Sequence, residues 1–171
     1  QLMVALPGSS NHATHVHTCG PACNHDQDSL YVDSVTGVEA NATDLLRGKW
    51  NTTNLKFKFL EDAPSYYSAG AEERSGFDSF TNSMKNATVE ILEQIESFTN
   101  INFTETTNEN QYGVVTFAQA TLPNGTGAWA YYPSGSNYGG DVWTNNRYSS
   151  TTDMTLGKYG YFTIMHEIGH A

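Results

Sequence analysis

Residues near the end of the chain have types and a spacing that suit metal-assisted hydrolysis. His166 and His170 are four positions apart and Glu167 follows the first histidine, which gives the pattern H-E-x-x-H inside the run YFTIMHEIGHA. The apolar residues of this run suit a buried helix. In a helix, residues i and i+4 lie one turn apart on the same face, so the two imidazoles can converge on one tetrahedral metal ion. The spacing therefore predicts a site for Zn²⁺.

Glu167 is the expected general base of this site. It stands next to the first ligand, from where it can reach a water in the open position of the metal and accept its proton. A zinc ion lowers the pKa of that water and polarises a carbonyl group, so a peptide bond can be cleaved without a covalent enzyme intermediate. The alternative is a packed helix with incidental histidines. With 6 histidines in 171 residues, chance placement would give the pattern in only about 1% of such chains.

The segments that must position the motif follow a mixed α+β pattern. The alternation of apolar residues in 55–59 predicts a half-buried strand. Apolar residues three, four and seven apart predict one long helix over about 77–98, starting after Ser75 or Gly76 and ending at Thr99 and Asn100. Further β-prone runs are 114–118, 128–132 and 141–144. The expected fold is a mixed sheet with helices packed on it. The residues of the predicted helix stripe are Phe77, Phe80, Met84, Ile91, Ile95 and Phe98.

Composition limits the number of domains and the classes of partner. A chain of 171 residues that is 38% hydrophobic and 12% aromatic is sufficient for one packed core. The formal net charge is −10, and the 8 Lys and Arg residues are scattered singly. No basic patch is therefore present to bind nucleic acid or an anionic membrane surface. No apolar run approaches the roughly 20 residues of a membrane helix.

Residues 1–43 are expected to form a leader or arm without sustained periodicity. Five potential metal ligands lie close together in this part of the chain, and three interpretations stay open for them. They are a loosely ordered arm with or without a small disulfide loop, a second metal site, and an inhibitory leader whose thiolate blocks the active zinc. The residues concerned are His15, His17, Cys19, Cys23 and His25.

Asparagine sequons give weak support for export. Five Asn-x-Ser/Thr triplets would suit a secreted protein, although a chain rich in Asn and Thr forms several by chance. The opening residues 1–7 are too short for a complete signal peptide and could be the end of one. The sequons begin at Asn41, Asn51, Asn86, Asn102 and Asn124.

Several segments in the same order resemble a known family. From about Leu46 to Ala171, the runs INFTE (101–105), GAWAY (127–131), GDVWTN (140–145) and YFTIMHEIGHA (161–171) are similar to those of the serralysins, secreted zinc endopeptidases of the metzincin group. The resemblance implies a metzincin-like twisted mixed β-sheet with a long backing helix and a C-terminal active-site helix. Residues 44–171 would then be the N-terminal part of an extracellular zinc-metallopeptidase catalytic domain. Calcium is implied as a further cofactor of the full-length protein.

The resemblance also implies roles for particular residues. His166 and His170 would be zinc ligands and Glu167 the base. The region 127–132 would be an edge strand on which a protein or peptide substrate lies extended, because such pairing gives main-chain affinity with broad side-chain tolerance. The candidate positions for substrate binding on this strand are Ala128, Trp129, Ala130 and Tyr131.

The chain departs from the family pattern after His170. Metzincins extend the motif to H-E-x-x-H-x-x-G-x-x-H and follow it with a Met-containing turn, and a catalytic zinc normally has three protein ligands. These 171 residues supply two, so we expect the isolated piece to be inactive and to belong to a longer protein. Two alternatives are a non-catalytic zinc-binding or peptide-binding module on the same fold, and an unrelated α+β domain with a chance motif.

Overall fold

The computed structural model describes residues 48–171 of the chain. The predicted leader over 1–43, its histidines and cysteines, the sequon at Asn41 and the expected start of the body near residue 44 lie outside the described residues.

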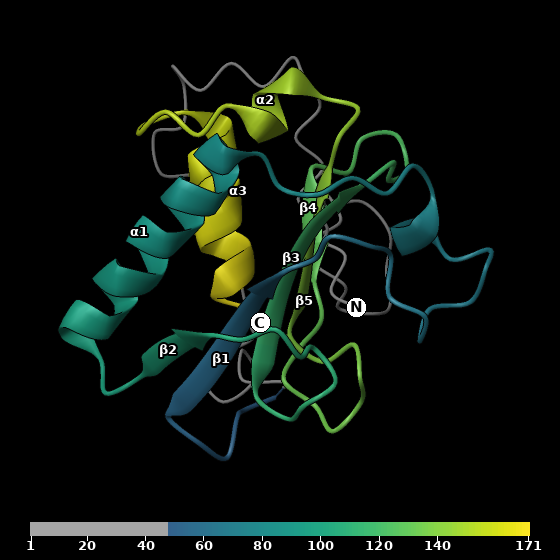
Figure 1. Cartoon of the computed structure of the whole chain (residues 1–171). Coiled ribbons are helices and arrows are strands. Elements are labelled where there is room, and N and C mark those ends of the chain that lie inside the picture. The colour runs from purple at the N-terminus through teal and green to yellow at the C-terminus, as the bar shows by residue number, and fades with distance from the viewer. Residues whose placement is uncertain (1–47) are drawn as a thin grey trace, which may run out of the picture.

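The described residues form a mixed five-stranded sheet with helices, which confirms the α+β class (Figure 1). The strand order is β2-β1-β3-β5-β4, in which β1, β2, β3 and β5 are parallel and β4 runs antiparallel to β5 at one edge. The strands are β1 (Asn54–Phe59), β2 (Asn102–Glu105), β3 (Val114–Ala120), β4 (Ala128–Ala130) and β5 (Asp141–Asn145). The helices are η3 (Glu72–Arg74), α1 (Asn82–Phe98), α2 (Ser149–Thr152) and α3 (Tyr159–Ile168).

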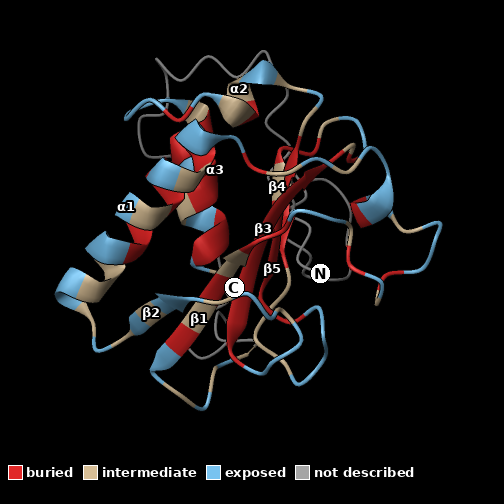
Figure 2. Cartoon of the chain, in the orientation of Figure 1, coloured by how far each residue is buried: buried red, intermediate tan, exposed pale blue. Residues whose placement is uncertain are grey.

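Both faces of the sheet are covered, and each has its own apolar core. Helices α1 and α3 lie on one face, which we call the front face, and the segment that contains η3 lies on the other, the back face (Figure 1). The central strands β3 and β5 are buried along their whole length (Figure 2). Because side chains alternate along a strand, Phe117 packs in the front core and Ala118 in the back core. The near-continuous apolar runs that predicted these strands reflect this double burial.

Helix α1 begins five residues later than the sequence predicted. Asp78 and Gln119 form an antiparallel bridge with N···O distances of 3.0 and 2.9 Å, so the backbone at Asp78 pairs with the sheet instead of starting a helix. Phe77 then lies on the back face against Trp143. Thr81 ends this crossing segment, because its hydroxyl accepts a hydrogen bond from the Met84 amide and caps the helix.

The predicted end of α1 at Thr99 is confirmed, but the predicted stripe is only partly buried. Met84 and Ile91 are fully buried against the sheet, whereas Phe98 is 75% exposed. The prediction was wrong for Phe98, because among residues 48–171 the front core extends along the helix only as far as Ile95. Buried small residues, Ala87 and Thr88, complete the contact face instead.

The back face holds a buried carboxyl group at its centre. Asp141 is 0% exposed; it accepts hydrogen bonds from the hydroxyls of Thr116 at 2.7 Å and of Tyr66 and Tyr67, both at 2.8 Å. Burial raises the pKa of Asp141 from its ordinary value of 3.8 to about 6, although these three donors act in the opposite direction. Its two tyrosine bonds fasten the start of the back-face segment to β5.

The buried carboxyl gives a testable dependence of stability on pH. Because the pKa of Asp141 is higher in the folded state, the folded protein keeps a proton that the unfolded chain releases between about pH 4 and pH 6. The stabilisation from this group is complete below about pH 3 and is lost as the pH rises through about 6. Relative to an Asp141→Asn variant, the unfolding free energy of the wild type should fall by about 2 kcal/mol between pH 4 and pH 7. Urea unfolding at several pH values measures this difference, and parallel curves for the two proteins would contradict it.

Candidate active site

Helix α3 positions the H-E-x-x-H motif at the edge of the front core. Tyr161, Ile164 and Ile168 are spaced by three and four residues and are all buried, so they fix the rotation of the helix. The helix ends at Ile168, and Gly169 is its C-cap with φ −65° and ψ −18°. The sequence had suggested that the helix runs through the whole motif. Instead His170 lies in the closing turn, where its amide donates to the carbonyl of Glu167 at 3.0 Å.

The structure brings the two predicted ligands together. The Nε2 atoms of His166 and His170 are 3.0 Å apart, and their ring planes are nearly perpendicular at 84°. Two nitrogens bound at 2.0–2.1 Å to a tetrahedral zinc ion would be about 3.3 Å apart, so the pair fits the metal after a small adjustment. Among residues 48–171, no group of three or more His, Cys, Asp or Glu side chains surrounds a common metal position. The described residues therefore supply two of the usual three ligands.

Glu167 lies between the ligands in sequence and is far more buried than they are. Its side chain is 6% exposed, whereas His166 is exposed and His170 is half-buried. Burial raises the pKa of Glu167 to about 8, because desolvation disfavours the charged carboxylate. An opposite charge held nearby favours the ionised form of a carboxylate. The position and environment of this group thus fit a base that acts beside a cation.

The edge strand β4 lies next to α3. The ring of Tyr132, two residues past β4, packs edge-on against that of His170 with centroids 5.9 Å apart. At the other end of the strand, Tyr159 of α3 approaches Gly127 so closely that a Cβ at that position would lie 2.3 Å from its hydroxyl. Gly127 is thus explained by close packing of the helix on the strand.

The four predicted substrate-strand positions alternate in the direction of their main-chain groups: those of Trp129 and Tyr131 face β5, and those of Ala128 and Ala130 face the outer edge. Ala128, Trp129 and Ala130 form β4, and Tyr131 lies just past its assigned end but still donates its amide to the carbonyl of Asp141 at 2.9 Å. Hydrogen bonds to β5 involve Gly127 and Tyr131, so strand alternation turns the main-chain groups of Ala128 and Ala130 to the outer edge. Within the described residues, no strand pairs with this edge.

Three of these four side chains are occupied in packing, and that of Ala128 is only a methyl group. Trp129 and Ala130 are 0% exposed and belong to the back and front cores respectively. Tyr131 packs against the back core. What β4 offers to a ligand is consequently its main chain.

An apolar cavity of about 360 Å³ adjoins the motif. It lies between the C-terminal parts of α1 and α3 and the strands β1 and β2, and His170 and Tyr132 both line it. Most of its wall is apolar and includes Leu55, Ile95 and Phe103.

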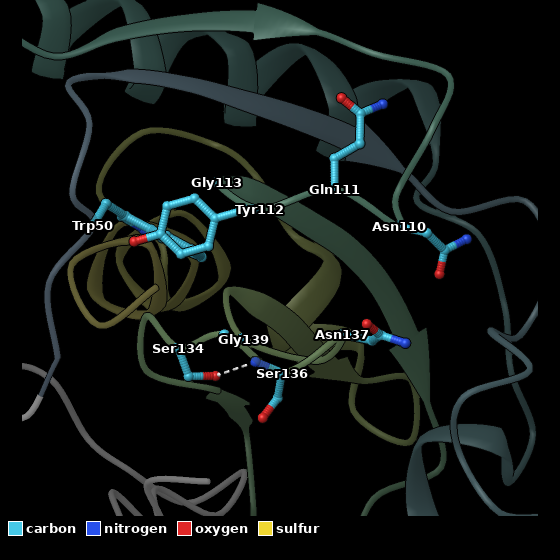
Figure 3. Close-up of a pocket in the computed structure, with 10 residues that line it drawn as sticks. Trp50, Asn110, Gln111, Tyr112, Gly113, Ser134, Ser136, Asn137 and Gly139 are labelled. Atoms are coloured by element: carbon cyan, nitrogen blue, oxygen red, sulfur yellow. Dashed lines mark hydrogen bonds between the residues drawn. The ribbon is translucent and has the colours of Figure 1, made fainter.

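A second pocket lies away from the motif and has a different character. It measures about 70 Å³ and lies between the Trp50–Tyr112 ring pair and the loop 134–139 (Figure 3). None of its ten lining residues is a His, Cys, Asp, Glu, Lys or Arg. Because it lacks a group that exchanges protons near neutral pH, it is not a candidate for acid–base catalysis.

Comparison with curated proteins decides the family. A serralysin of Photorhabdus sp. (strain Az29) is 32% identical over 99% of this chain, and serralysin C of Dickeya chrysanthemi is 32% identical over 86% of it. Metalloprotease AprA of Pseudomonas entomophila is 32% identical over 71%. The chain belongs to the serralysin-like metzincin family. It spans about a third or less of the length of these relatives, namely 33%, 33% and 25%.

No family model matches the chain. Within residues 48–171, no helix has both the length and the apolar character needed to cross a membrane.

Sequence reasoning missed the residues that support β4 from behind. Glu73 is 4% exposed, and its carboxylate accepts a hydrogen bond from the Tyr131 hydroxyl. Asp141 was noted only as part of a family-like run. An available signal was an acidic residue inside an apolar β-prone segment, because Asp is disfavoured in strands and is seldom fully buried without partners.

Proposed function

We propose that residues 44–171 form the N-terminal part of the catalytic domain of a secreted, extracellular zinc metalloendopeptidase. Its fold would be the metzincin-like twisted sheet backed by α1, with α3 as the active-site helix. The observation that carries the proposal is the 3.0 Å approach of the two Nε2 atoms of His166 and His170 beside the buried Glu167. Membership of a family whose relatives are named metalloproteases supports it.

Three residues of this chain would bind the metal and transfer the proton during peptide hydrolysis. When bound, zinc supplies Lewis acidity, which lowers the pKa of a coordinated water and polarises the scissile carbonyl. His166 and His170 hold the ion through Nε2, on a helix whose buried face fixes their position. Glu167 accepts the proton of the attacking water on its carboxylate and delivers it to the leaving amine. Withdrawal of its side chain from solvent strengthens these electrostatic interactions.

The substrate would bind as an added strand. The main-chain groups of Ala128 and Ala130 at the outer edge of β4 can pair with an extended peptide, and such pairing would accept many side chains. The ring contact between Tyr132 and His170 supports this arrangement, because it joins the end of the strand to a proposed zinc ligand. We propose proteins and peptides in extended conformation as substrates, and neither nucleic acid nor membrane as partner, given the net charge of −10.

A complete catalytic centre would need a third ligand. In the family pattern this is a histidine six residues after the second, followed by a Met-containing turn. The 171 residues alone are therefore expected to bind zinc weakly and to cleave nothing. Calcium would be a further cofactor of a longer form.

The proposal is tested by supplying the missing segment. Residues 1–171 would be joined at Ala171 to the part of the Photorhabdus relative that follows the aligned region, and casein cleavage would be followed with and without a chelator. We expect chelator-sensitive cleavage by the fusion and none by residues 1–171. The same fusion with Glu167→Ala controls for activity of the added segment, and cleavage by residues 1–171 alone would refute the expectation of inactivity.

A second candidate is a non-catalytic zinc-binding or peptide-binding module. It is favoured by the presence of two ligands and an open edge strand without a third ligand among the described residues. Binding of a peptide or of zinc by a fusion that never cleaves casein would support this candidate over the peptidase.

A further inference from the structure

A side-chain hydrogen bond joins the end of β4 to the back layer. The Tyr131 hydroxyl donates a short hydrogen bond to Oε1 of Glu73, across 58 positions of sequence. A buried carboxylate is retained only where it is hydrogen-bonded or paired. Because Glu73 is 4% exposed, loss of this donor would leave an acceptor without compensation. Hydrogen bonds to a charged group are also stronger than those between neutral groups.

The back layer that carries Glu73 is itself fastened to the sheet. The Tyr67 hydroxyl donates to Asp141 on the N-terminal side of η3, and on the C-terminal side the amide of Thr121 donates to the carbonyl of Ser75 at 2.7 Å. Glu73 therefore sits on a turn that is fixed at both sides. Because this turn is fixed, the Glu73 carboxylate can hold the side chain of Tyr131 in one position.

The main-chain pairing that holds strand β4 is short. It pairs with β5 over only three assigned residues, Ala128 to Ala130, and its outer edge has no partner strand among residues 48–171. Beyond Ala130 the ring of Tyr131 packs against those of Tyr67 and Tyr138, with centroids 6.1 and 5.0 Å away. These ring contacts limit where the hydroxyl can point, and Glu73 fixes it.

We propose that Glu73 and Tyr131 are positioning residues that hold the outer edge of β4 from the back face of the sheet, so that its main chain is ready to pair with substrate. The proposal rests on the proposed peptidase function and adds to it a residue pair that never touches the substrate through its side chains. A rigid edge loses less entropy on binding, and substrate affinity therefore depends on this remote bond.

Loss of the bond between Glu73 and Tyr131 should change KM but not kcat. Tyr131→Phe and Glu73→Ala should each raise KM for a peptide substrate about threefold to tenfold, as expected for one lost hydrogen bond, and leave kcat nearly unchanged. The reason is that strand pairing is made equally in the ground and transition states. The double variant should be no worse than either single variant, because both remove the same contact. Glu73→Gln retains an acceptor oxygen and should restore most of the affinity.

A readout independent of activity separates this inference from the proposed function. Hydrogen exchange of the β4–β5 ladder amides of Trp129, Tyr131 and Asn145 should be accelerated in Tyr131→Phe and Glu73→Ala. Tyr112→Phe is the matched control, because it removes a tyrosine hydroxyl that accepts a bond from Asn51 elsewhere in the fold. It should change neither exchange at β4 nor KM.

Kinetics measured on a casein-cleaving form that contains residues 1–171 distinguish failure of this proposal from failure of the proposed peptidase function. Faster ladder exchange with a higher KM in both variants supports the proposal. Unchanged exchange, or a fall in kcat with KM unchanged, overturns it while the peptidase function stands. Absence of cleavage by every wild-type form overturns the proposed function, and the role in substrate binding with it, whatever the exchange shows.

Discussion

Replacing either His166 or His170 with alanine should abolish chelator-sensitive peptide cleavage by a casein-cleaving form of the protein. Each substitution removes one imidazole from a pair whose Nε2 atoms are 3.0 Å apart. Loss of outer partners of a ligand already costs about 10–100-fold in metal affinity or activity, so loss of a ligand should cost at least about 100-fold in zinc affinity. Zinc content after dialysis and casein cleavage measure the two effects together.

The matched control for these variants is His12→Ala, which removes a histidine outside both the motif and the N-terminal cluster. It should retain zinc and activity. Cleavage that survives in both motif variants would contradict the assignment of the ligands.

Replacing Glu167 with glutamine should lower kcat/KM by about 10²–10⁴-fold, the usual contribution of a general acid–base group. Glutamine has nearly the same shape, so it can occupy the buried position of Glu167, but it cannot accept the proton. Zinc content and the thermal midpoint should change little, because Glu167 is not expected to be a ligand.

The control for this variant is Glu93→Gln, which removes one negative charge from the exposed side of α1. It should behave as wild type. Activity of Glu167→Gln within about threefold of wild type would exclude this residue as the base, since such a change is far below the usual acid–base contribution.

The local parts of the fold could be predicted because their signals lie within a few residues. Alternation over 55–59 and the apolar runs at Val114 and Asp141 predicted β1, β3 and β5, and the structure confirms these strands. The histidine spacing predicted that the imidazoles converge, and they do. Each of these inferences depends only on the periodicity of a helix or a strand.

The errors come from interactions between distant residues. The bridge between Asp78 and Gln119 joins segments 41 positions apart and moves the start of α1 to Asn82. No local pattern shows which backbone groups a remote strand will satisfy. Phe98 was assigned to the buried stripe by spacing alone, but burial of the last turn depends on what packs over it.

The back-face carboxyls were missed for the same reason. Asp141 is stabilised by hydroxyls from Thr116, Tyr66 and Tyr67, and Glu73 by Tyr131, all far away in sequence. A sequence reader sees acidic residues in an acidic chain and assigns them to the surface. Only the folded arrangement shows that both carboxyls are hydrogen-bonded within the layer behind β4.

The proposed zinc site can be tested by X-ray absorption at the zinc K-edge. The casein-cleaving form would be loaded with one equivalent of zinc and compared with its His166→Ala, His170→Ala double variant. We expect imidazole nitrogens at about 2.0–2.1 Å from the zinc in the wild type, with a loss of two of them, or of the bound zinc, in the double variant. An imidazole contribution that is unchanged in the double variant would place the zinc elsewhere and rule out His166 and His170 as its ligands.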